Sequence, residues 1–540
     1  MSDLTLTNTP RAAPAVAKPN LDQKPHVSLT AVFILFLVSG IGYAAYGVVT
    51  DTSNVGETLT LGALVLLGVA LMIALGFEFV NGFHDTANAV ATVIYTHSLP
   101  PITAVIWSGV FNFLGVVVST GAVAYGIITL LPVELILQVG SAGGYAMIFS
   151  LLIAAIVWNL GTWAMGIPNS SSHCLIGSIM GVGLANQLTA PAGQGTSGVD
   201  WSQAVNVGKA LLFSPAIGFA LSALLLLLLK VVIPIPRLYQ EPEDTKTPWW
   251  IRGVLIFTCA SVSFAHGGND GQKGMGLIML ILIGVAPTAY ALNRTMPDAS
   301  TPAFLEITNK ARSVLNAHAE GARQPSLDDA RKQIGAALKT RDLNRRDVFA
   351  ALASLSAEIA SGVESYGSIR RVPAAATPNM RNDMYLVADA IRLFPEAGAK
   401  FSPDETAVLQ DYRSSLESGT RFIPTWVKVS VAIALGLGTM VGWRRIVVTV
   451  GERIGKQHLT YAQGAAAEIV AAGTILGAEF YGLPVSTTHI LSSGVAGTMA
   501  ANGSGLQMAT IRAIVTAWFL TFPAAMLIAG CLYIVVRSLL

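Results

Sequence analysis

The feature that most constrains this chain is the apolar stretch that recurs along almost its whole length. Eight or nine stretches reach or approach about 18 residues, close to the roughly 20 that a helix needs to cross a hydrocarbon layer of about 30 Å. They are 29–50, 59–80, 103–127, 147–165, 208–233, 254–264 with 274–292, 424–442, 461–481 and 510–536. Buried helices of a soluble protein would explain one or two of them. The sequence therefore predicts an all-α, polytopic membrane protein.

The charged residues are few and unevenly placed. They make up 12% of the 540 residues, against about 25% in an ordinary soluble domain. Between Leu292 and Pro424 lie 17 of the 33 Lys and Arg residues and 16 of the 31 Asp and Glu residues. The formal net charge of +2 and this near balance argue against a nucleic-acid surface. The charged segment is instead expected to be a water-exposed insert in a membrane protein.

The boundaries of the parts follow from these shifts in composition. We expect a disordered, Pro- and Ala-rich tail and then an uncleaved helix, because the polar region before it is too long for a signal peptide. Ser402, Pro403 and Glu405 predict a capped helix start within the insert. The predicted parts are a tail (1–28), an extra transmembrane helix (29–50), repeat 1 (58–233), a loop (234–249), the first part of repeat 2 (250–290), a soluble helical insert (291–423) and the second part of repeat 2 (424–540).

Two pairs of polar motifs indicate an internal duplication. The first pair is "NGFHDTANAVAT" (81–92) and "HGGNDGQKGMGL" (266–277), and the second is "GIPNSSSHCLIG" (166–177) and "GLPVSTTHILSS" (482–493). The step from aspartate to histidine is 88 residues in the first copy; in the second it is 219, or 86 without the 133-residue insert. The same order and nearly the same spacing predict two repeats.

Cation placement predicts that the two repeats lie in opposite orientations. The segment 51–58, which precedes repeat 1, carries two acids and no cation, whereas repeat 2 follows a segment with four cations. The loop 443–457 holds four cations, but its counterpart 128–146 holds no Lys or Arg. Because positive loops stay inside, this pattern predicts inverted repeats, as in many secondary transporters, with the N-terminus inside and the insert outside.

The hydroxyl clusters after each Gly-x-Pro predict new helix starts. Proline disfavours helix just before itself, and Ser and Thr are good N-caps. A helix start offers unpaired N–H groups and the positive end of the helix dipole to an anion. The alternative for a single copy is a proline kink whose hydroxyls bond to the preceding turn. As a pair, the clusters predict broken helices that offer an anion site at Ser170, Ser171, Ser172, Ser486, Thr487 and Thr488.

The other motif pair places one acid in each repeat. Asp85 and Asp270 lie in apolar surroundings, where a carboxylate is expensive and usually functional. Glycines beside them (Gly82, Gly267, Gly268 and Gly271) predict local unwinding that offers carbonyls to a cation. Two carboxylates in one cavity would repel an anion by about 3 kcal/mol per contact at an effective dielectric near 20. The sequence therefore predicts cation-coupled anion symport rather than an anion channel.

At these residues the chain resembles the inorganic phosphate transporter (Pit) family, most closely its bacterial low-affinity members. The motifs "NGFHDTANAVATVIYT", "WNLGTWAMGIPNSSSHCLIG", "FAHGGNDGQKGMGLIMLILIGVAP", "GWRRIVVTVGERIGKQHLTYAQG" and "GLPVSTTHILSSGVAGTM" carry the likeness, over roughly residues 60–540. It implies a multi-pass phosphate transporter of the bacterial inner membrane. It also implies cation and substrate binding by Asp85, Asn88 and Asp270. The hydroxyl clusters would then be the tips of re-entrant hairpins and face phosphate.

The chain departs from the family signature in both copies of its acidic motif. His84 replaces an Asn in the first, and Gln272-Lys273 replaces Ala-Asn in the second. The bacterial branch shares these changes and is associated with proton coupling and metal-phosphate. Our hypothesis is that the Lys273 ammonium occupies the place of a coupling cation. The candidates for cation or proton coupling are Asp85, Asn88, Asp270, Asn269, Lys273, His84, His173 and His489, although His173 and His489 could equally bond backbone carbonyls.

Several alternatives remain open at this stage. We expect no tightly bound cofactor; the co-transported ion is a proton or sodium, with a divalent metal held transiently by Asp85 and Asp270 together with the substrate. Arsenate should compete with phosphate, sulfate is the nearest rival substrate, and a homo-oligomer or a channel-like sensor is conceivable. An intramembrane hydrolase is remote, because adjacent Ser172 and His173 point apart on a helix. Glu78, Glu468 and Glu479 are expected in ion pairs or on a water-lined face.

Overall fold

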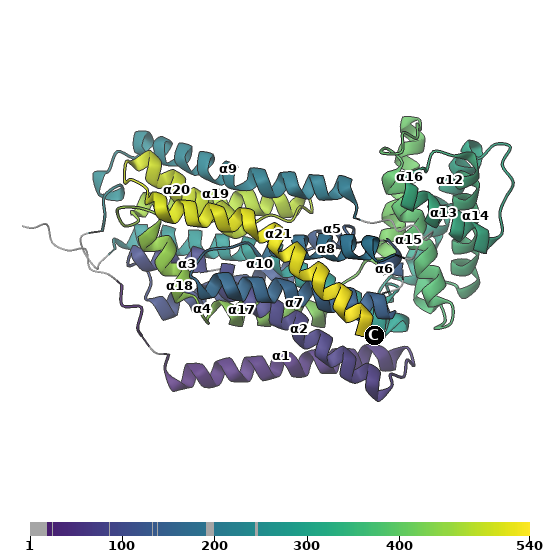
Figure 1. Ribbon diagram of the computed structural model, residues 1–540, viewed down its shortest axis with the longest axis horizontal. Helices are drawn as coiled ribbons and strands as arrows, with labels where there is room; N and C mark the ends of the chain where they lie inside the picture. The colour runs from purple at the N-terminus through teal and green to yellow at the C-terminus, as the bar shows by residue number, and fades with distance from the viewer. Residues whose placement is uncertain are drawn as a thin grey trace, which may run out of the picture.

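The computed structural model describes residues 19–23, 25–85, 87–131, 133–137, 139–190, 199–242 and 247–539. The side chains at 87, 88, 133, 134 and 203 also lie outside the described part, as does most of the predicted tail 1–28. The described residues form helices and no β-strand. Long helices run side by side along the long axis of the molecule, and a bundle of shorter helices covers one end (Figure 1). The all-α class is confirmed.

The helices of the membrane part are long and apolar. They are α1 (Val27–Asn54), α2 (Leu61–Asp85), α3 (Ala87–Tyr95), α4 (Pro101–Val118), α5 (Ala122–Ile128), α6 (Val133–Leu137), α7 (Ala142–Ala164), α8 (Ser171–Leu188), α9 (Trp201–Val232), η1 (Pro236–Leu238), α10 (Trp249–Val285), α11 (Pro287–Tyr290), α17 (Thr425–Thr439), α18 (Arg444–Val448), η4 (Thr449–Arg453), α19 (Tyr461–Phe480), α20 (Thr487–Asn502) and α21 (Met508–Leu539).

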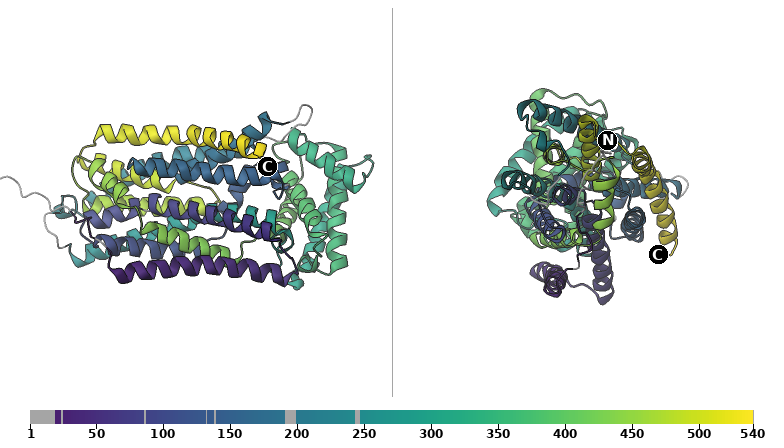
Figure 2. Two further views of the ribbon diagram at one scale, coloured as in Figure 1. Left: turned by 60° about the horizontal axis from the view of Figure 1, so that its bottom comes forward. Right: turned by 90° about the vertical axis from the view of Figure 1, so that its left-hand side faces the viewer.

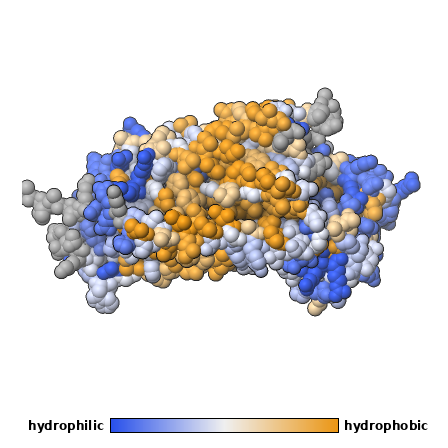
Figure 3. Space-filling model, turned by 90° about the horizontal axis from the view of Figure 1, so that it is seen from below, coloured by the Kyte–Doolittle hydropathy of each residue, from blue (hydrophilic) through white to orange (hydrophobic). Residues whose placement is uncertain are grey.

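Eight segments in the described part of the chain are long and apolar enough to cross a membrane. One of them, Arg346–Tyr366, belongs to the insert, where its apolar residues are buried in the insert's own core. Many large apolar side chains of α1, α2, α9 and α21 are exposed. They form a broad hydrophobic belt between two hydrophilic ends (Figure 3). This belt is the surface that a polytopic membrane protein presents to lipid.

The insert is a separate helical bundle at one end of the membrane part (Figures 1 and 2). Its elements are η2 (Asp298–Ser300), α12 (Thr301–His318), α13 (Leu327–Thr340), α14 (Arg346–Tyr366), η3 (Ile369–Arg371), α15 (Thr377–Leu393) and α16 (Pro403–Thr420). They surround a hydrophobic core of their own. The predicted start of α16 is confirmed: Ser402 and Glu405 form a reciprocal capping box, and Pro403 is the first helical residue.

The two halves of the membrane part exchange packing partners. Helix α8 packs on α21 and α20 packs on α9, while α4 crosses α10 and α17 crosses α2. Equivalent pairs also form within the halves, α2 with α7 and α10 with α19. Each of these six pairs becomes another of the six when the halves are interchanged, as expected for two copies related by a twofold axis. Their opposite orientation in the bilayer stays a prediction.

The predicted unwinding beside Asp270 is wrong. Helix α10 is continuous from Trp249 to Val285, through Gly267, Gly268 and Gly271. The glycines instead allow close approach between helices: a Cβ at Gly267 would lie 2.1 Å from the backbone oxygen of Asn112 in α4. At the matched place in the first copy, a Cβ on Gly82 would lie 2.2 Å from Leu435 O in α17. Small residues at such crossings let membrane helices approach closely.

Candidate functional site

Each Gly-x-Pro motif ends one helix and begins another, as predicted. Helix α7 stops at Ala164, and Gly166 then takes the left-handed conformation (φ 69°) with its N–H on Trp163 O. In the second copy Gly482 has φ 65°, and its N–H bonds to Glu479 O at the end of α19. After the proline, Ser170 and Ser486 are the N-caps of α8 and α20. The predicted helix starts are therefore confirmed.

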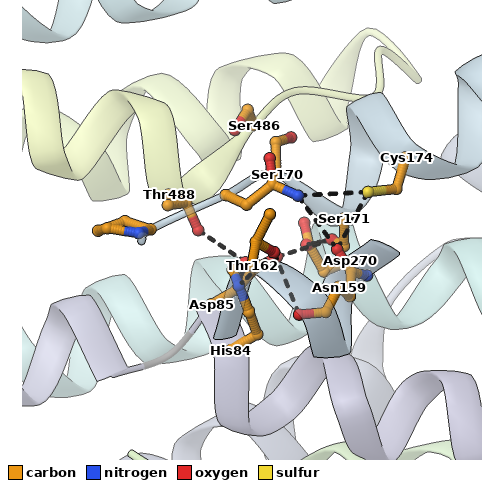
Figure 4. A network of polar contacts seen from close by, with 12 residues as sticks. His84, Asp85, Asn159, Thr162, Ser170, Ser171, Cys174, Asp270, Ser486 and Thr488 are labelled. Atoms are coloured by element: carbon orange, nitrogen blue, oxygen red, sulfur yellow. Dashed lines mark hydrogen bonds and ion pairs between the residues drawn. The ribbon is translucent and has the colours of Figure 1, made fainter. Parts of the chain in front are cut away.

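The two helix starts meet the acid of the first repeat inside the protein (Figure 4). Asp85, at the end of α2, is 4% exposed. The Ser171 hydroxyl of α8 donates to Asp85 Oδ2 at 2.7 Å, and the Thr488 hydroxyl of α20 donates to Asp85 Oδ1 at 2.8 Å. Elements from both repeats thus bind one carboxylate. The acids and hydroxyls that the sequence singled out lie in a single buried centre.

Asp270, in the middle of α10, completes this centre from the other repeat. Its Oδ2 lies 3.2 Å from the Ser171 hydroxyl, and its Oδ1 forms an ion pair with Lys273 Nζ at 2.7 Å. Lys273 is fully buried and also donates to the Ser172 hydroxyl, which in turn donates to Val485 O at 2.7 Å. The ammonium therefore joins α10 to both hairpins. That this ammonium takes the place of a coupling cation stays a hypothesis.

A histidine that the sequence reasoning missed also reaches the centre. His266 precedes Asp270 by four residues, so both side chains lie on one face of α10. Its Nε2 lies 3.6 Å from Asp270 Oδ2, and its Nδ1 lies 2.9 Å from Asn112 Oδ1. An amide oxygen only accepts, so Nδ1 carries a proton and Nε2 faces the carboxylate. The i, i+4 spacing in "HGGND" was the signal that could have revealed it.

Asp85, His266 and Asp270 together have the geometry of a cation site. One ligand atom from each lies within 4.8 Å of the others, and all three residues are buried. If both carboxylates are ionised, they repel each other by about 3.5 kcal/mol at an effective dielectric near 20. The Lys273 ammonium balances only one of the two charges. A proton or a metal ion among these atoms would balance the other.

The three predicted proton-carrying histidines lie in different places. His84 contacts the centre directly, with Nδ1 3.1 Å from Asp85 Oδ1 and Nε2 3.3 Å from the Thr162 hydroxyl. His173 and His489 instead lie against each other, with ring centroids 4.6 Å apart, and His489 stacks on Trp518. His173 Nδ1 is 2.9 Å from the Ser170 hydroxyl. Of the three histidines, His84 thus contacts a carboxylate of the centre. His173 and His489 contact each other in the first turns of α8 and α20.

The remaining predicted site residues support the hairpins. The hydroxyls of Ser170 and Ser486 accept the backbone N–H groups of His173 and His489. Thr487 is buried, and its hydroxyl has no hydrogen bond to the described residues. Asn269 donates to Leu483 O at 3.2 Å instead of facing the acids. The side chain of Asn88 lies outside the described part of the chain.

The three glutamates outside the centre bond to neutral groups of the described residues, so of the two expected settings, an ion pair or a water-lined face, the ion pair is wrong. The fully buried Glu468 accepts hydrogen bonds from the Thr92 and Thr258 hydroxyls, the latter at 2.5 Å. Glu479 Oε1 accepts from Gln272 Nε2 at 3.0 Å. Glu78 Oε2 accepts from Asn81 Nδ2 at 3.4 Å. Buried carboxyls in such surroundings are stabilised by their hydroxyl and amide donors.

The fold and this centre define a class of protein. Paired membrane helices place two buried acids, an ammonium and two helix N-termini at one point that both halves of the chain share. Such a centre, at the interface of two repeats and built on broken helices, is typical of secondary transporters. The arrangement suits an anion accompanied by cations.

Comparison with known proteins identifies the family. Residues 81–529 match the phosphate transporter family, so the chain belongs to it. It is 41% identical over 500 residues to the low-affinity inorganic phosphate transporter PitA of Escherichia coli (strain K12), covering 88% of this chain and 97% of PitA. PitB of the same organism is 39% identical over 506 residues (90% of this chain, 99% of PitB). The chain is thus a multi-pass transporter of the bacterial inner membrane, and not an enzyme.

Among solved structures, one described as "The sodium-dependent phosphate transporter" is 20% identical to this chain. It has a TM-score of 0.48 and covers 88% of this chain and 100% of that chain.

Proposed function

We propose that this protein imports inorganic phosphate by proton-coupled symport and binds the phosphate between the starts of α8 and α20. The resemblance of the sequence to bacterial Pit transporters agrees with this direction and substrate. The centre supplies the two components that symport requires: donors for an anion and acids for a cation. Alternating access would expose this centre to one side of the membrane at a time.

The observation that carries the proposal is the position of the Ser171 hydroxyl between two carboxylates. Its oxygen lies 2.7 Å from Asp85 Oδ2 and 3.2 Å from Asp270 Oδ2. A hydroxyl has one proton to donate, so two ionised carboxylates cannot both receive it. A proton on either acid, or a metal ion between them, removes the conflict. The centre is therefore suited to take up a cation when it takes up phosphate.

Phosphate would replace the carboxylate as the partner of the hydroxyls. At present Ser171 and Thr488 donate directly to Asp85, so the helix starts and the acid are in contact. The N–H groups of Ser171 and Ser172 precede the first helical hydrogen bond, from Cys174 N to Ser170 O, and have no partner within the helix, whereas the His173 N–H donates to the Ser170 hydroxyl. Separation of the hairpins from α2 would open a space lined by these donors. A tetrahedral oxyanion fits such a site.

The carboxylates also favour phosphate over sulfate. A protonated phosphate carries a P–O–H group that donates a hydrogen bond, and Asp85 can accept it. Sulfate has no such proton, so its oxygens would meet the carboxylate with repulsion. Arsenate is protonated like phosphate and should compete with it. Phosphate that enters as a neutral complex with a divalent metal would place the metal among Asp85, His266 and Asp270.

Uptake of labelled phosphate into proteoliposomes tests the proposal. An imposed pH gradient should drive accumulation by the wild-type protein, in the presence or absence of sodium, and added divalent metal should increase the rate. Asp85→Asn should abolish accumulation, whereas the matched variant Asp51→Asn should preserve it, because Asp51 accepts a hydrogen bond from Trp426 and lies outside the centre. Accumulation that requires a sodium gradient would refute proton coupling. Accumulation of sulfate with equal affinity would refute the proposed basis of selectivity.

A further inference from the structure

A hollow lies where the insert meets the membrane part. It contains about 500 Å³ of atom-free space, open solvent included. Residues of α5, α6 and the last turns of α10 line it from the membrane part, and residues of α15 and the segment after α16 line it from the insert. Half of these residues are apolar, and the other half are two arginines, two tyrosines and two threonines. The polar residues determine what the hollow can bind.

Arg381, in α15, is a buried cation that has no carboxylate partner among the residues that the structure describes. Its side chain lines the hollow, and the residue is 7% exposed. Two hydrogen bonds from Nη1 reach Ile136 O and Asn382 Oδ1, both at 3.1 Å, and the guanidinium lies 5.5 Å from the centroid of the Tyr385 ring. Within the described part of the chain it forms no ion pair, and burial lowers the pKa of its guanidinium. Buried charges are normally paired, so an anion is the expected partner.

A second cation and an unused donor line the same hollow. Arg421 pairs with Glu417 at 3.0 Å, and its guanidinium lies 5.4 Å from the centroid of the Tyr125 ring. The Tyr125 hydroxyl is buried and makes no hydrogen bond with the residues that the structure describes. Arginine forks bind phosphate oxygens in pairs, and a phenol hydroxyl can donate to a third oxygen. The donor set therefore suits a phosphate group.

The hollow lies on the side of the centre that faces the insert. Met279 and Ile283 of α10 line it, and they follow Lys273 on the same continuous helix by about 9 and 15 Å. A phosphate group bound here would be close to the centre and separated from it by two to three helical turns.

We propose that this hollow binds a phosphate group through Arg381 and Arg421, with the Tyr125 hydroxyl as a third donor. The group is the free phosphate of transport, held between the insert-side solution and the acidic centre, or the headgroup of an anionic lipid. The first source rests on the proposed function. The insert thereby contributes residues to phosphate recognition that the transmembrane motifs lack.

Phosphate uptake from each side of the membrane tests the first source. With phosphate on the insert side, Arg381→Gln should raise KM by about tenfold or more and leave kcat nearly unchanged, because charge-assisted hydrogen bonds are lost before the substrate reaches the centre. With phosphate on the opposite side, KM should stay the same, and Arg381→Lys should restore part of the affinity. A structural role for Arg381 would change both sides equally.

Arg392→Gln is the matched control. Arg392 also lies in α15 and ties the insert to the membrane part through Asp200 at 3.0 Å, but it does not line the hollow. The Arg392→Gln variant should leave the KM for phosphate unchanged, with phosphate on either side of the membrane. Since a glutamine at 381 keeps a donor for Ile136 O, thermal unfolding in detergent should show that the Arg381→Gln variant is folded.

Thermal unfolding with and without phosphatidylglycerol tests the lipid source. A lipid headgroup in the hollow would stabilise the wild-type protein in phosphatidylglycerol, and Arg381→Gln would lose this stabilisation without a change in KM. If Arg381→Gln changes neither the insert-side KM nor the response to lipid, the inference is overturned. Failure of the wild-type protein to accumulate phosphate would instead refute the proposed function.

Discussion

The Lys273 ammonium is the residue whose removal tests the electrostatics of the centre most sharply. Its Nζ lies 2.7 Å from Asp270 Oδ1, and both side chains are buried. At an effective dielectric near 20 this attraction amounts to about 6 kcal/mol. Removal of one partner of a buried ion pair typically costs about 3–5 kcal/mol, because the other charge is left uncompensated. Lys273→Asn should therefore leave Asp270 and Asp85 facing each other without a fixed cation.

The expected result is a loss of proton-driven uptake that an added cation partly reverses. A change of about 3–5 kcal/mol corresponds to a factor of roughly 100 to several thousand in apparent affinity for phosphate. Uptake of labelled phosphate by Lys273→Asn in sodium-free buffer should fall accordingly, and sodium at about 100 mM should restore part of it by filling the vacated place. Lys428→Asn is the matched control, because Lys428 donates to Ser119 O, at 2.8 Å, and to no carboxylate among the described residues.

Proton-driven uptake by Lys273→Asn with the pH dependence of the wild-type protein would refute this reasoning. It would mean that the ammonium neither neutralises the acids nor takes the place of a coupling cation.

Three further predictions concern packing, the insert and topology. Gly267→Ala should lower thermal stability by about 1–3 kcal/mol, because its Cβ would meet a backbone oxygen at 2.1 Å, whereas Gly253→Ala, in open space on the same helix, should stabilise slightly. A backbone hydrogen bond at the start of α16 lowers the pKa of Glu405. The Glu405 carboxylate therefore stabilises the fold above its unfolded pKa, and this stabilisation is lost as pH falls through the lower folded pKa. In Glu405→Gln the melting temperature should fall less between neutral and acidic pH than in the wild-type protein. In a variant free of other cysteines, Ser53→Cys should react with an impermeant maleimide from outside, and Lys456→Cys only after permeabilisation; the reverse pattern would contradict the orientation.

Local rules predicted the parts of the centre that depend on local backbone chemistry. Gly-x-Pro followed by hydroxyls requires a helix end and a new N-cap, and Ser170 and Ser486 are the caps. The matched order of the motifs predicted that Asp85 and Asp270 share one place, which their separation within 4.8 Å confirms. These features follow from backbone donors and acceptors and from the duplication, so one sequence was enough.

The roles of the glycines, of His266 and of the glutamates depend on which helices cross. Local sequence patterns do not specify these crossings. Glycines such as Gly267 and Gly271 can either unwind a helix or let a second helix approach closely. Here they let α4 approach, which only the packed structure shows. His266 becomes part of the centre because Asn112, 154 positions away in the chain, turns its Nε2 toward Asp270. The glutamates were expected in ion pairs or on a water-lined face, but Glu468 accepts hydrogen bonds from the hydroxyls of Thr92 and Thr258, which lie on other helices.

The location of the bound oxyanion is the most direct test of the account. Arsenate should occupy the phosphate site, and diffraction data collected at the arsenic absorption edge would give its position independently of the protein. The account predicts one strong peak about 4–5 Å from the Ser171 and Thr488 hydroxyl oxygens, at the starts of α8 and α20, with the hairpins displaced from Asp85. A strong peak elsewhere in the membrane part, with both hydroxyls still bonded to Asp85, would contradict it.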